Sequence, residues 1–562
     1  MISLLLAGAV IGSFWGGSDA MIGERALAHV LVVDGMSLPA LLAVPELSGV
    51  ARSGGAALMN GRSPVRDEIL SLTPPCPGIR ICPLDTPEGL VYEDMGSASP
   101  GELGDRIREI AGAHAGPVLL MVVSASPPAS TAADGDELGA VVASWGANRD
   151  LLAFEGVPRA LTSDSTRRAG VVATVDPAAT VAEWLDLPYD AGAPIRATDE
   201  PAPLSLYERY LQQRRLAIPV AAVSWTLMGL AGLVSVLVLR FRHRVSDRII
   251  ATAGAMAASL PWLALGLLLV GHLPSLTPWT VAAFLVAFTV AGVASGRWVA
   301  ARRGILTAVS ATGAVILLAL GLEAATGWPA AVTPLAGGGQ LDGGRFFGMP
   351  NAEIGLVLGA ALFAAHRIRT VGGTALLGLC ALITGSPWTG ANFGAAITLF
   401  AAAGLWLGIR TRRPWWFIAL LTAAITTAGM LVISVMHRYL TERPTHVTAF
   451  LEGSGGVTGA LQRSIDRLGV GLDLVLESPF SALPVIGTVV LLVVVLRPPP
   501  SVAASFDGRD RWRDAVLTIL LGSVVAYLAN DTGAAALGFG FGTAMSGLLD
   551  VSLATARGKM RR

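Results

Sequence analysis

Charged residues are scarce in this chain of 562 residues, where Asp, Glu, Lys and Arg together make up 14%. A soluble globular protein carries about 25% of these residues. Hydrophobic residues make up 53% of the chain, and its mean hydropathy is +0.62. This composition excludes a disordered or collagen-like chain and favours a membrane protein. Only three cysteines occur, too few for a scaffold held together by disulfides.

Missing motifs exclude several functions. No run of basic residues resembles a nucleic-acid surface, so no nucleic-acid partner is expected. The glycine-rich stretch 337–344 lacks the Lys-Ser/Thr end of a phosphate-binding loop, which argues against an ATP-driven pump. No Ser-His-Asp arrangement, haem motif or zinc motif is visible.

The net charge of zero is the sum of two opposed parts. Residues 1–216 hold 26 acidic and 15 basic residues, a net of −11, whereas residues 217–562 hold 14 and 25, a net of +11. From residue 217 onward, apolar segments recur between short charged interruptions. At about 20 residues per span, this pattern predicts an all-α membrane bundle of about 11 helices. The predicted helices cover 217–239, 249–271, 278–296, 304–323, 353–366, 371–386, 389–408, 415–436, 480–496, 515–530 and 533–553.

Every second connection in this bundle is rich in arginine, and the alternate ones are poor in basic residues. Because basic residues favour the cytoplasmic side, the pattern predicts a multi-pass protein of the cell membrane with a cytoplasmic C-terminus. The part before residue 217 is then extracytoplasmic. The basic residues that carry this inference are Arg240, Arg242, Arg244, Arg248, Arg297, Arg302, Arg303, Arg367, Arg369, Arg410, Arg412, Arg413, Arg497, Arg509, Arg511, Arg513, Arg557, Lys559, Arg561 and Arg562.

The exported part is predicted to be an α/β domain with a mainly parallel sheet. Short β-rich apolar runs occupy 29–34, 118–123 and 170–175, and helical patterns fall at 100–112 and 137–144. The predicted organisation is a signal-like or anchor segment at 1–20, the exported α/β domain at 25–199, a linker and juxtamembrane helix at 200–216, the first eight bundle helices at 217–436, an outer amphipathic segment at 437–479, the last three helices at 480–554 and a basic tail at 555–562.

Two of these segments leave alternatives open. Residues 2–14 resemble a signal-peptide core or anchor without a positive n-region, or form a buried element of the first domain. The amphipathic stretch 459–476 lies along the outer membrane interface or packs against the exported domain. Cys76 and Cys82, in a proline-rich exported loop, are a candidate disulfide, whereas Cys380 falls within a predicted span and is expected to serve packing.

Two stretches of the first domain resemble the alkaline phosphatase superfamily. HVLVVDG (29–35) is similar to the opening strand of that fold, and LTSDSTRRAGVVATVDPAATVAEWLDLP (161–188) is similar to its closing segment. The resemblance implies an alkaline phosphatase-like fold in which Asp34 and Asp164 are candidate catalytic metal ligands, with a divalent metal expected if the domain is active. The whole layout is similar to a group of uncharacterised bacterial membrane proteins with such an exported domain.

The departures from that superfamily point to a pseudoenzyme. Ser165 stands where the metal-binding His would be, and Ala179 replaces the Pro of a D-x-x-P-T motif whose Asp176 and Thr180 match. The superfamily's two-metal site needs several Asp and His ligands, yet the domain holds only His29 and His114. We therefore expect the hydrolase chemistry to be lost or strongly altered. Asn60 and Ser63 fall in the nucleophile region, and neither is a firm candidate.

Arginine pairs and broken helices supply the candidate binding residues. Arg167 and Arg168 form a pair able to clamp a phosphate or carboxylate, the alternative being a solvated surface or a salt bridge. Three polar motifs, at 337–355, 384–395 and 530–533, interrupt the bundle on its predicted outer side. Transporters build substrate sites from discontinuous helices with polar ends, and ionisable residues inside a membrane are functional by default. The candidate substrate-binding residues in these motifs are Arg345, Asn351, Glu353, Asn392, Asn530 and Asp531. The alternative is that Asn351 and Asn392 cap helices, that 530–533 is a tight turn and that Arg345 is an exposed surface residue.

Three functions remain open from the sequence. The first is a membrane protein that binds or transports an anionic lipid-linked or lipid-like envelope substrate at its outer face, with a non-catalytic exported domain. The second is a metal-dependent phosphohydrolase or phosphotransferase of the envelope. The third is a non-catalytic scaffold for envelope assembly, with envelope proteins as partners.

Overall fold

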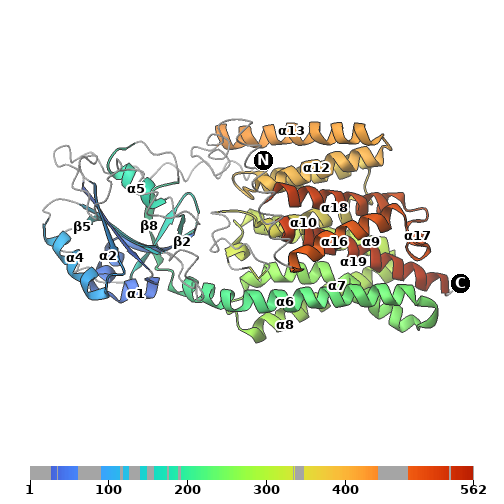
Figure 1. Ribbon diagram of the computed structural model, residues 1–562, viewed down its shortest axis with the longest axis horizontal. Helices are drawn as coiled ribbons and strands as arrows, with labels where there is room; N and C mark the ends of the chain where they lie inside the picture. Colours follow the sequence, from blue (N-terminus) through green and yellow to red (C-terminus); the bar gives the residue numbers. More distant parts are fainter. Residues whose placement is uncertain are drawn as a thin grey trace.

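The computed structural model contains a mixed α/β sheet domain followed by a helical bundle (Figure 1). It describes residues 27–34, 36–60, 90–113, 118–125, 140–147, 157–166, 168–173, 176–187, 192–332, 334–335, 347–440, 479–530 and 533–560.

The sheet has eight strands, seven of which follow the order β3-β1-β4-β5-β2-β6-β8, while β7 pairs with β2. Strands β3 and β4 flank β1 in parallel, and β6 and β7 pair with β2 in parallel. Strand β5 runs antiparallel to both β4 and β2, and β8 runs antiparallel to β6. The strands are β1 (Leu27–Asp34), β2 (Gly55–Asn60), β3 (Leu90–Gly96), β4 (Val118–Ala125), β5 (Ala140–Ala147), β6 (Arg159–Ser163), β7 (Val171–Ala173) and β8 (Ile195–Pro201).

Both faces of the sheet are covered, which explains why β1 is a continuous apolar run rather than an alternating one. Leu31 and Val33 face a core shared with α1, α2 and α4, while Val30 and Val32 face a second core closed by α5. The four helices are α1 (Leu38–Ala43), α2 (Pro45–Ser53), α4 (Pro100–Ala113) and α5 (Asp176–Trp184).

The sheet is mixed: four of its strand pairs are parallel, whereas β5 is inserted antiparallel between two strands that share one direction and β8 is antiparallel to β6. One prediction for this domain needs correction. The stretch 137–144 was predicted to be helical, but its described residues 140–144 belong to β5, where Val141 and Val142 are buried on opposite faces of the sheet. β-Branched residues pack well on a pleated surface buried on both sides.

Helix α6 (Leu204–Arg240) joins the two parts of the molecule as one continuous helix of 37 residues. At about 1.5 Å per residue it is about 55 Å long, well beyond the ~30 Å of a bilayer core. Its first turns, predicted as a linker and a separate juxtamembrane helix, bring Tyr207 and Tyr210 into the core of the sheet domain. Figure 1 shows α6 running from beneath the sheet along the bundle.

All eleven predicted membrane segments are helical, but they differ in length. Eight helices of the described residues are long and apolar enough to cross a membrane, or up to nine if the bent pair α16–α17 counts as one, which is consistent with a multi-pass membrane protein. Helices α10 and α11 are shorter. The remaining bundle helices are α7 (Asp247–Leu269), α8 (Pro278–Arg303), α9 (Ile305–Ala325), α10 (Ile354–Ala365), α11 (Thr370–Gly385), α12 (Phe393–Arg410), α13 (Trp415–Tyr439), α16 (Pro479–Leu496), α17 (Pro500–Phe506), α18 (Asp510–Ala529) and α19 (Gly533–Met560).

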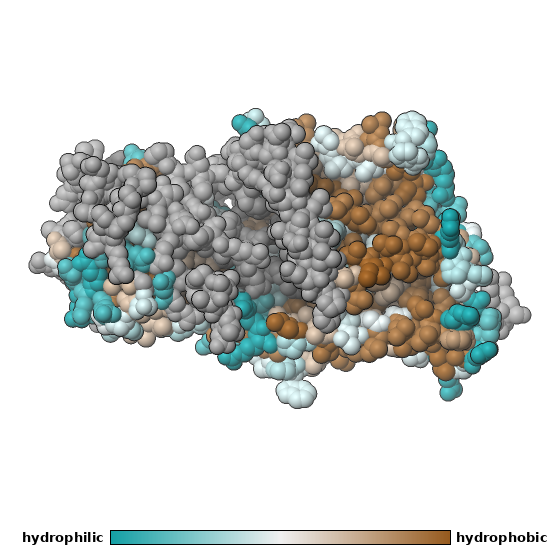
Figure 2. All heavy atoms as spheres, viewed as in Figure 1, coloured by the Kyte–Doolittle hydropathy of each residue, from teal (hydrophilic) through white to brown (hydrophobic). Residues whose placement is uncertain are grey.

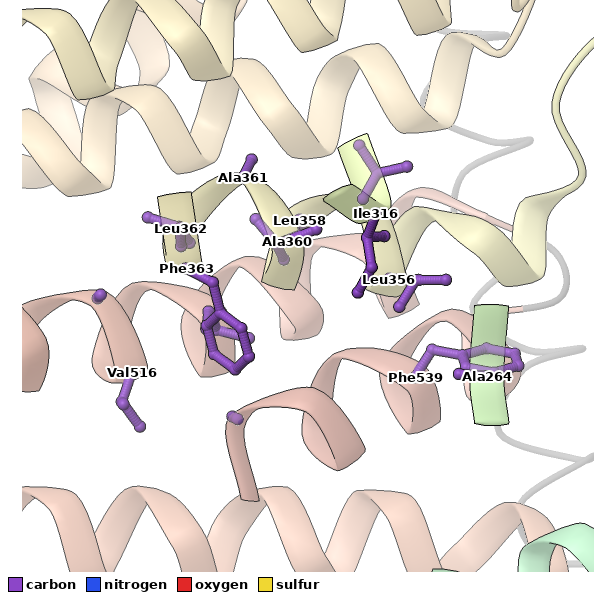
Figure 3. Packing of buried hydrophobic residues seen from close by; sticks show 14 of the residues in the cluster. Ala264, Ile316, Leu356, Leu358, Ala360, Ala361, Leu362, Phe363, Val516 and Phe539 are labelled. Carbon is purple, nitrogen blue, oxygen red and sulfur yellow. The ribbon is translucent and has the colours of Figure 1, made fainter. Parts of the chain in front are cut away.

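The short helix α10 lies at the centre of the bundle. Every residue from Ile354 to Phe363 is buried, as expected for a helix that is apolar on all sides. In Figure 3, side chains of α10 pack among Ile316 of α9, Val516 of α18 and Phe539 of α19. Helix α10 therefore contacts protein, not lipid, over nearly all of its surface.

The helices run up and down, so their connections gather at two ends of the bundle (Figure 1). We call the end beside the sheet the domain end and the opposite one the distal end. The arginine-rich connections predicted from the sequence all lie at the distal end, and Figure 2 shows hydrophilic residues there beside a broad hydrophobic surface.

Candidate functional site

The polar motifs predicted from the sequence converge at the domain end of the bundle. The side chain of Asn392 is fully buried and begins α12, where its Oδ1 accepts a hydrogen bond from the amide of Ala395 at 2.9 Å. Its Nδ2 donates to the carbonyl of Met349 at 3.0 Å and to Oδ1 of Asn351 at 3.1 Å. One asparagine thus caps a helix and fixes a loop that is 41 residues away in sequence.

Glu353 and Asn530 complete this group. Glu353 ends the 3-10 turn η6 (Asn351–Glu353), which leads into α10, and is 2% exposed. Asn530 follows α18 and donates from Nδ2 to the carbonyl of Ala526 at 2.8 Å. A Cβ at Gly394 would lie 1.9 Å from Oδ1 of Asn530, so the Asn530 amide lies directly against the first turn of α12. We call Asn351, Glu353, Asn392 and Asn530 the polar cluster.

The polar cluster lies deep within the bundle. Helix α10 has 12 residues, so it is about 18 Å long, roughly 12 Å less than a bilayer core. Its C-terminus adjoins the distal arginines Arg367 and Arg369, so its N-terminus and Glu353 end well short of the opposite surface. Irregular backbone at such depth is tolerated only where it is enclosed by protein or lines a cavity.

A hydrogen-bonded path connects the sheet domain to the polar cluster. The guanidinium of Arg168 donates from Nη2 to the carbonyl of Gly327 at 3.2 Å and to that of Trp328 at 3.4 Å. The indole of the buried Trp328 donates to the carbonyl of Thr389, in the α11–α12 loop, at 2.6 Å. In the same loop, the carbonyl of Gly390 accepts from the amide of Met349, the residue held by Asn392.

The turn at Trp328 is held in place by Glu323, which is 4% exposed. Its Oε1 contacts Nε2 of His272, and its Oε2 accepts from the amide of Ala330 at 3.1 Å. Trp328 has a φ of 59°, a conformation that strains a bulky residue and persists only where its surroundings enforce it. Burial lowers the pKa of the Arg168 guanidinium, and the nearby Glu323 charge opposes that shift.

The sheet does not bring the two predicted metal ligands together. Asp34 ends β1 and Asp164 follows β6, and both side chains are exposed. These strand ends share an edge but lie four strand spacings apart, about 19 Å. Two-metal sites hold their ions about 4 Å apart. Among the described residues, no group of three or more His, Cys, Asp or Glu is arranged to hold a metal ion.

Asp176, the first residue of the stretch that resembles D-x-x-P-T, is hydrogen-bonded inside the sheet domain. Its buried carboxylate accepts hydrogen bonds from the hydroxyls of Ser163 and Ser165 at 2.5 and 2.7 Å, and from the amides of Ala173 and Ala193 at 2.6 and 3.0 Å. Burial raises the pKa of Asp176, while these four donors act to lower it. Thr180 donates to the carbonyl of Asp176 and accepts from the amide of Ile195 at 2.8 Å.

Several predicted residues lie outside the described ones: Arg167, Arg345, Asp531, Cys76, Cys82, Ser63, His114 and the segments 1–20 and 459–476. Arg168 lies apart from the polar cluster, and its predicted role in binding an anion stays a prediction. Trp328 and Glu323 were not among the residues predicted from the sequence. A glutamate near the end of an apolar helix, followed by Gly-Trp-Pro, is the signal that marks them.

No protein-family model matches this chain, and searches of the curated proteins and of the solved structures found no significant match to it.

Proposed function

We propose that this protein binds an anionic lipid-linked or lipid-like substrate in its membrane bundle, at the polar cluster, and moves it or presents it at the domain end. The sheet domain is non-catalytic and closes or positions the entrance. Arg345 and Asp531, adjacent to the cluster in sequence, supply further charged groups to the substrate in this proposal.

The convergence of three helix interruptions at one buried place carries the proposal. The start of α10, the start of α12 and the break between α18 and α19 are far apart in sequence, yet Asn351, Asn392 and Asn530 gather within the bundle. Packing alone does not require amides and a carboxylate at this depth. Transporters use the ends of broken helices to bind polar substrates, because free backbone groups there solvate an ion that lipid would not.

The distribution of charge supports an orientation for this site. Arginine-rich connections gather at the distal end, and such loops favour the cytoplasm. We therefore place the distal end and the C-terminus in the cytoplasm, with the sheet domain and the polar cluster outside. In that arrangement the domain is exported, and its resemblance to the alkaline phosphatase superfamily concerns fold rather than chemistry.

A variant that introduces a negative charge tests the site. In Asn351→Asp, the new carboxylate still accepts the hydrogen bond from Asn392 but repels an anionic head group. The purified full chain is placed in vesicles of phosphatidylcholine with a trace of fluorescent phosphatidylglycerol, and movement of the probe between leaflets is followed by dithionite quenching. We expect movement above that of empty vesicles, reduced about tenfold by Asn351→Asp, a loss of about 1.4 kcal/mol.

Gln212→Glu is the matched control. Gln212 lies on α6 at the same end of the bundle, where its Oε1 accepts from the amide of Leu276 at 3.1 Å. The substitution keeps that acceptor and adds the same charge outside the polar cluster, so probe movement should not change. Probe movement equal to that of empty vesicles, or equal losses in both variants, would contradict the proposal.

A further inference from the structure

A second candidate site lies at the distal end of the bundle, opposite the polar cluster. A partly open cavity of about 730 Å³ is bounded by α7, α8, α9 and α19 and by the connection between α17 and α18. This volume falls in the usual range for small-molecule sites, about 300–1,000 Å³. Small side chains, such as those of Ala251, Ala300, Ala301 and Ala554, leave the space open.

Positive charge is in excess in this cavity. Arg297, Arg509 and Arg557 line it, against Asp507 and Asp550. Asp550 is 6% exposed and already paired, since its Oδ1 accepts from Nη2 of Arg297 at 2.7 Å. A Cβ at Gly254 would lie 3.3 Å from both Arg297 Nη2 and Asp550 Oδ1, so the absence of a side chain there makes room for the pair.

Some of the N–H donors of these arginines have no hydrogen-bond partner among the described residues. Among the described residues, the buried Nε atoms of Arg297 and Arg557 have no hydrogen-bond partner. Arg509 uses Nη1 for the hydroxyl of Thr555 at 2.9 Å and the carbonyl of Ser505 at 3.4 Å. A guanidinium carries five N–H donors, and buried donors are almost always satisfied. Three such groups around one space offer donors that suit an acceptor with several oxygens.

The surroundings of the cavity are apolar on the side of α8. A narrow crevice continues from Arg297 and Asp550 between α7, α8, α9, α10 and α19, where Trp262, Val293 and Phe363 line it. With about 30 Å³, this crevice is too small for an acyl chain. The outer face of α8 offers apolar surface that other helices do not cover. Val286 and Val290 are 65% and 61% exposed, and only 11% of this span is buried. A polar head held by the arginines would leave its tails against this exposed face.

We propose that the distal cavity binds the phosphate group of a membrane phospholipid. Phosphate oxygens match the planar guanidinium fork, which binds them in pairs, whereas a metal cation would be repelled by the surplus arginine charge. The cavity lies among the arginine-rich connections, at the level where phospholipid head groups meet an apolar helix surface. This inference is independent of the polar cluster, which lies at the other end of the helices.

Ligand-induced thermal stabilisation of the full chain in detergent tests the proposal. Three probes separate the chemistry: dioleoyl phosphatidylglycerol, dioleoylglycerol, which lacks phosphate, and inorganic phosphate. Phosphatidylglycerol should raise the melting temperature and dioleoylglycerol should not. Arg557→Gln and Arg509→Gln should each weaken the apparent affinity about tenfold to a hundredfold, the usual effect of one charged hydrogen-bond donor.

Arg303→Gln is the matched control, because Arg303 is exposed at the end of α8 and does not line the cavity. It should bind phosphatidylglycerol like the unsubstituted chain, because it removes one positive charge at the same end of the bundle without changing the cavity lining. Arg297→Gln would leave Asp550 unpaired, so the double variant Arg297→Gln/Asp550→Asn replaces it, and reduced binding is again expected.

Three results would overturn the proposal. One is equal stabilisation by phosphatidylglycerol and dioleoylglycerol, and another is unchanged affinity in Arg509→Gln and Arg557→Gln. The third is stabilisation by inorganic phosphate alone, which would replace the lipid by a free anion. Loss of binding in the cavity variants, with Arg303→Gln unaffected, would support it whether or not the polar cluster moves a lipid.

Discussion

At the scale of single residues, Asp176 shows how a motif that resembles a catalytic one serves the fold. Its two carboxylate oxygens accept four hydrogen bonds, two of them from the backbone amides of Ala173 and Ala193. Serine hydroxyls rotate to suit a new partner, but backbone amides only donate. The position therefore requires an acceptor on both sides of the side chain.

Asp176→Asn should accordingly destabilise the sheet domain by about 1–3 kcal/mol, because the new NH₂ group must face one backbone donor. Thermal unfolding followed by circular dichroism measures this loss. Glu183→Gln, an exposed change on the same helix, is the control and should have almost no effect. Equal melting temperatures for Asp176→Asn and the unsubstituted chain would show that the four hydrogen bonds are not needed.

Asn392 combines a helix cap with two contacts inside the polar cluster. Asn392→Ala removes all three hydrogen bonds and should cost about 1–3 kcal/mol of stability. Thr277 provides a comparison, since it caps α8 with its side chain but is exposed at the bundle surface. Thr277→Ala should cost less, about 0.5–1 kcal/mol. Melting temperatures in detergent compare the two variants, and similar losses would mean that the contacts to Met349 and Asn351 add nothing.

At the scale of elements, α10 and α19 pack through glycine. A Cβ at Gly355 would lie 2.0 Å from the carbonyl oxygen of Ala536 and 2.4 Å from the amide nitrogen of Gly540. Small residues at helix contacts let backbones approach closely, and in membranes this packing is a main source of stability. The contact also fixes the first turn of α10, which follows Glu353 directly.

Gly355→Ala should therefore push α10 away from α19 and destabilise the bundle by about 1–3 kcal/mol. Gly542→Ala is a matched control on α19, where no atom of a neighbouring element lies within 4 Å of the new Cβ. It should be neutral or stabilising by up to about 1 kcal/mol, because alanine is the better helix former. Thermal unfolding in detergent distinguishes the two, and an equally stable Gly355→Ala would contradict the close packing.

Helices and strands could be predicted from the sequence where the local hydropathy pattern determines their type. The apolar run at 29–34 and the segments of the bundle appear as β1 and as helices because hydropathy alone sets their type. The strand β5 was missed because its direction and its type depend on β2 and β4, which are distant in sequence. The continuity of α6 was not predicted, because 200–216 was assigned to a linker and a separate juxtamembrane helix, whereas α6 runs unbroken from Leu204 to Arg240 with Pro219 inside it.

The site was predictable only in part, for a similar reason. Asparagines beside glycines identified the interrupted helices, but no local pattern indicates that Asn392 binds Asn351 or that Asn530 lies on Gly394. Asp550 and Arg297 form a pair across 253 residues, and only the packing of α7 against both α8 and α19 brings them together. A single acidic residue in an apolar helix, such as Asp550, indicates that a basic partner is present but not which residue it is.

At the scale of the whole molecule, Arg168 joins the sheet domain to the bundle. It is the start of the path through Trp328 and the α11–α12 loop to Asn392, so a displacement of the domain has a route to the polar cluster. Helix α6 provides the second connection, through the hydrogen bond from Gln213 Nε2 to the carbonyl of Pro334 at 3.0 Å. Among the described residues, α6 and the hydrogen bonds of Arg168 thus connect the domain to the bundle.

Arg168→Gln should release one of these connections without unfolding either part. A charged donor to backbone carbonyls contributes about 1.5–3 kcal/mol, so the turn at 326–331 should open at least tenfold more often while α6 still tethers the domain. Hydrogen–deuterium exchange of the full chain measures this opening at the amides of Trp328, Ala330 and Ala331. Arg196→Gln, an exposed change on β8, should leave their exchange unaltered. If exchange in Arg168→Gln also stays unaltered, the Arg168 hydrogen bonds do not hold this turn, and the path through Trp328 is contradicted.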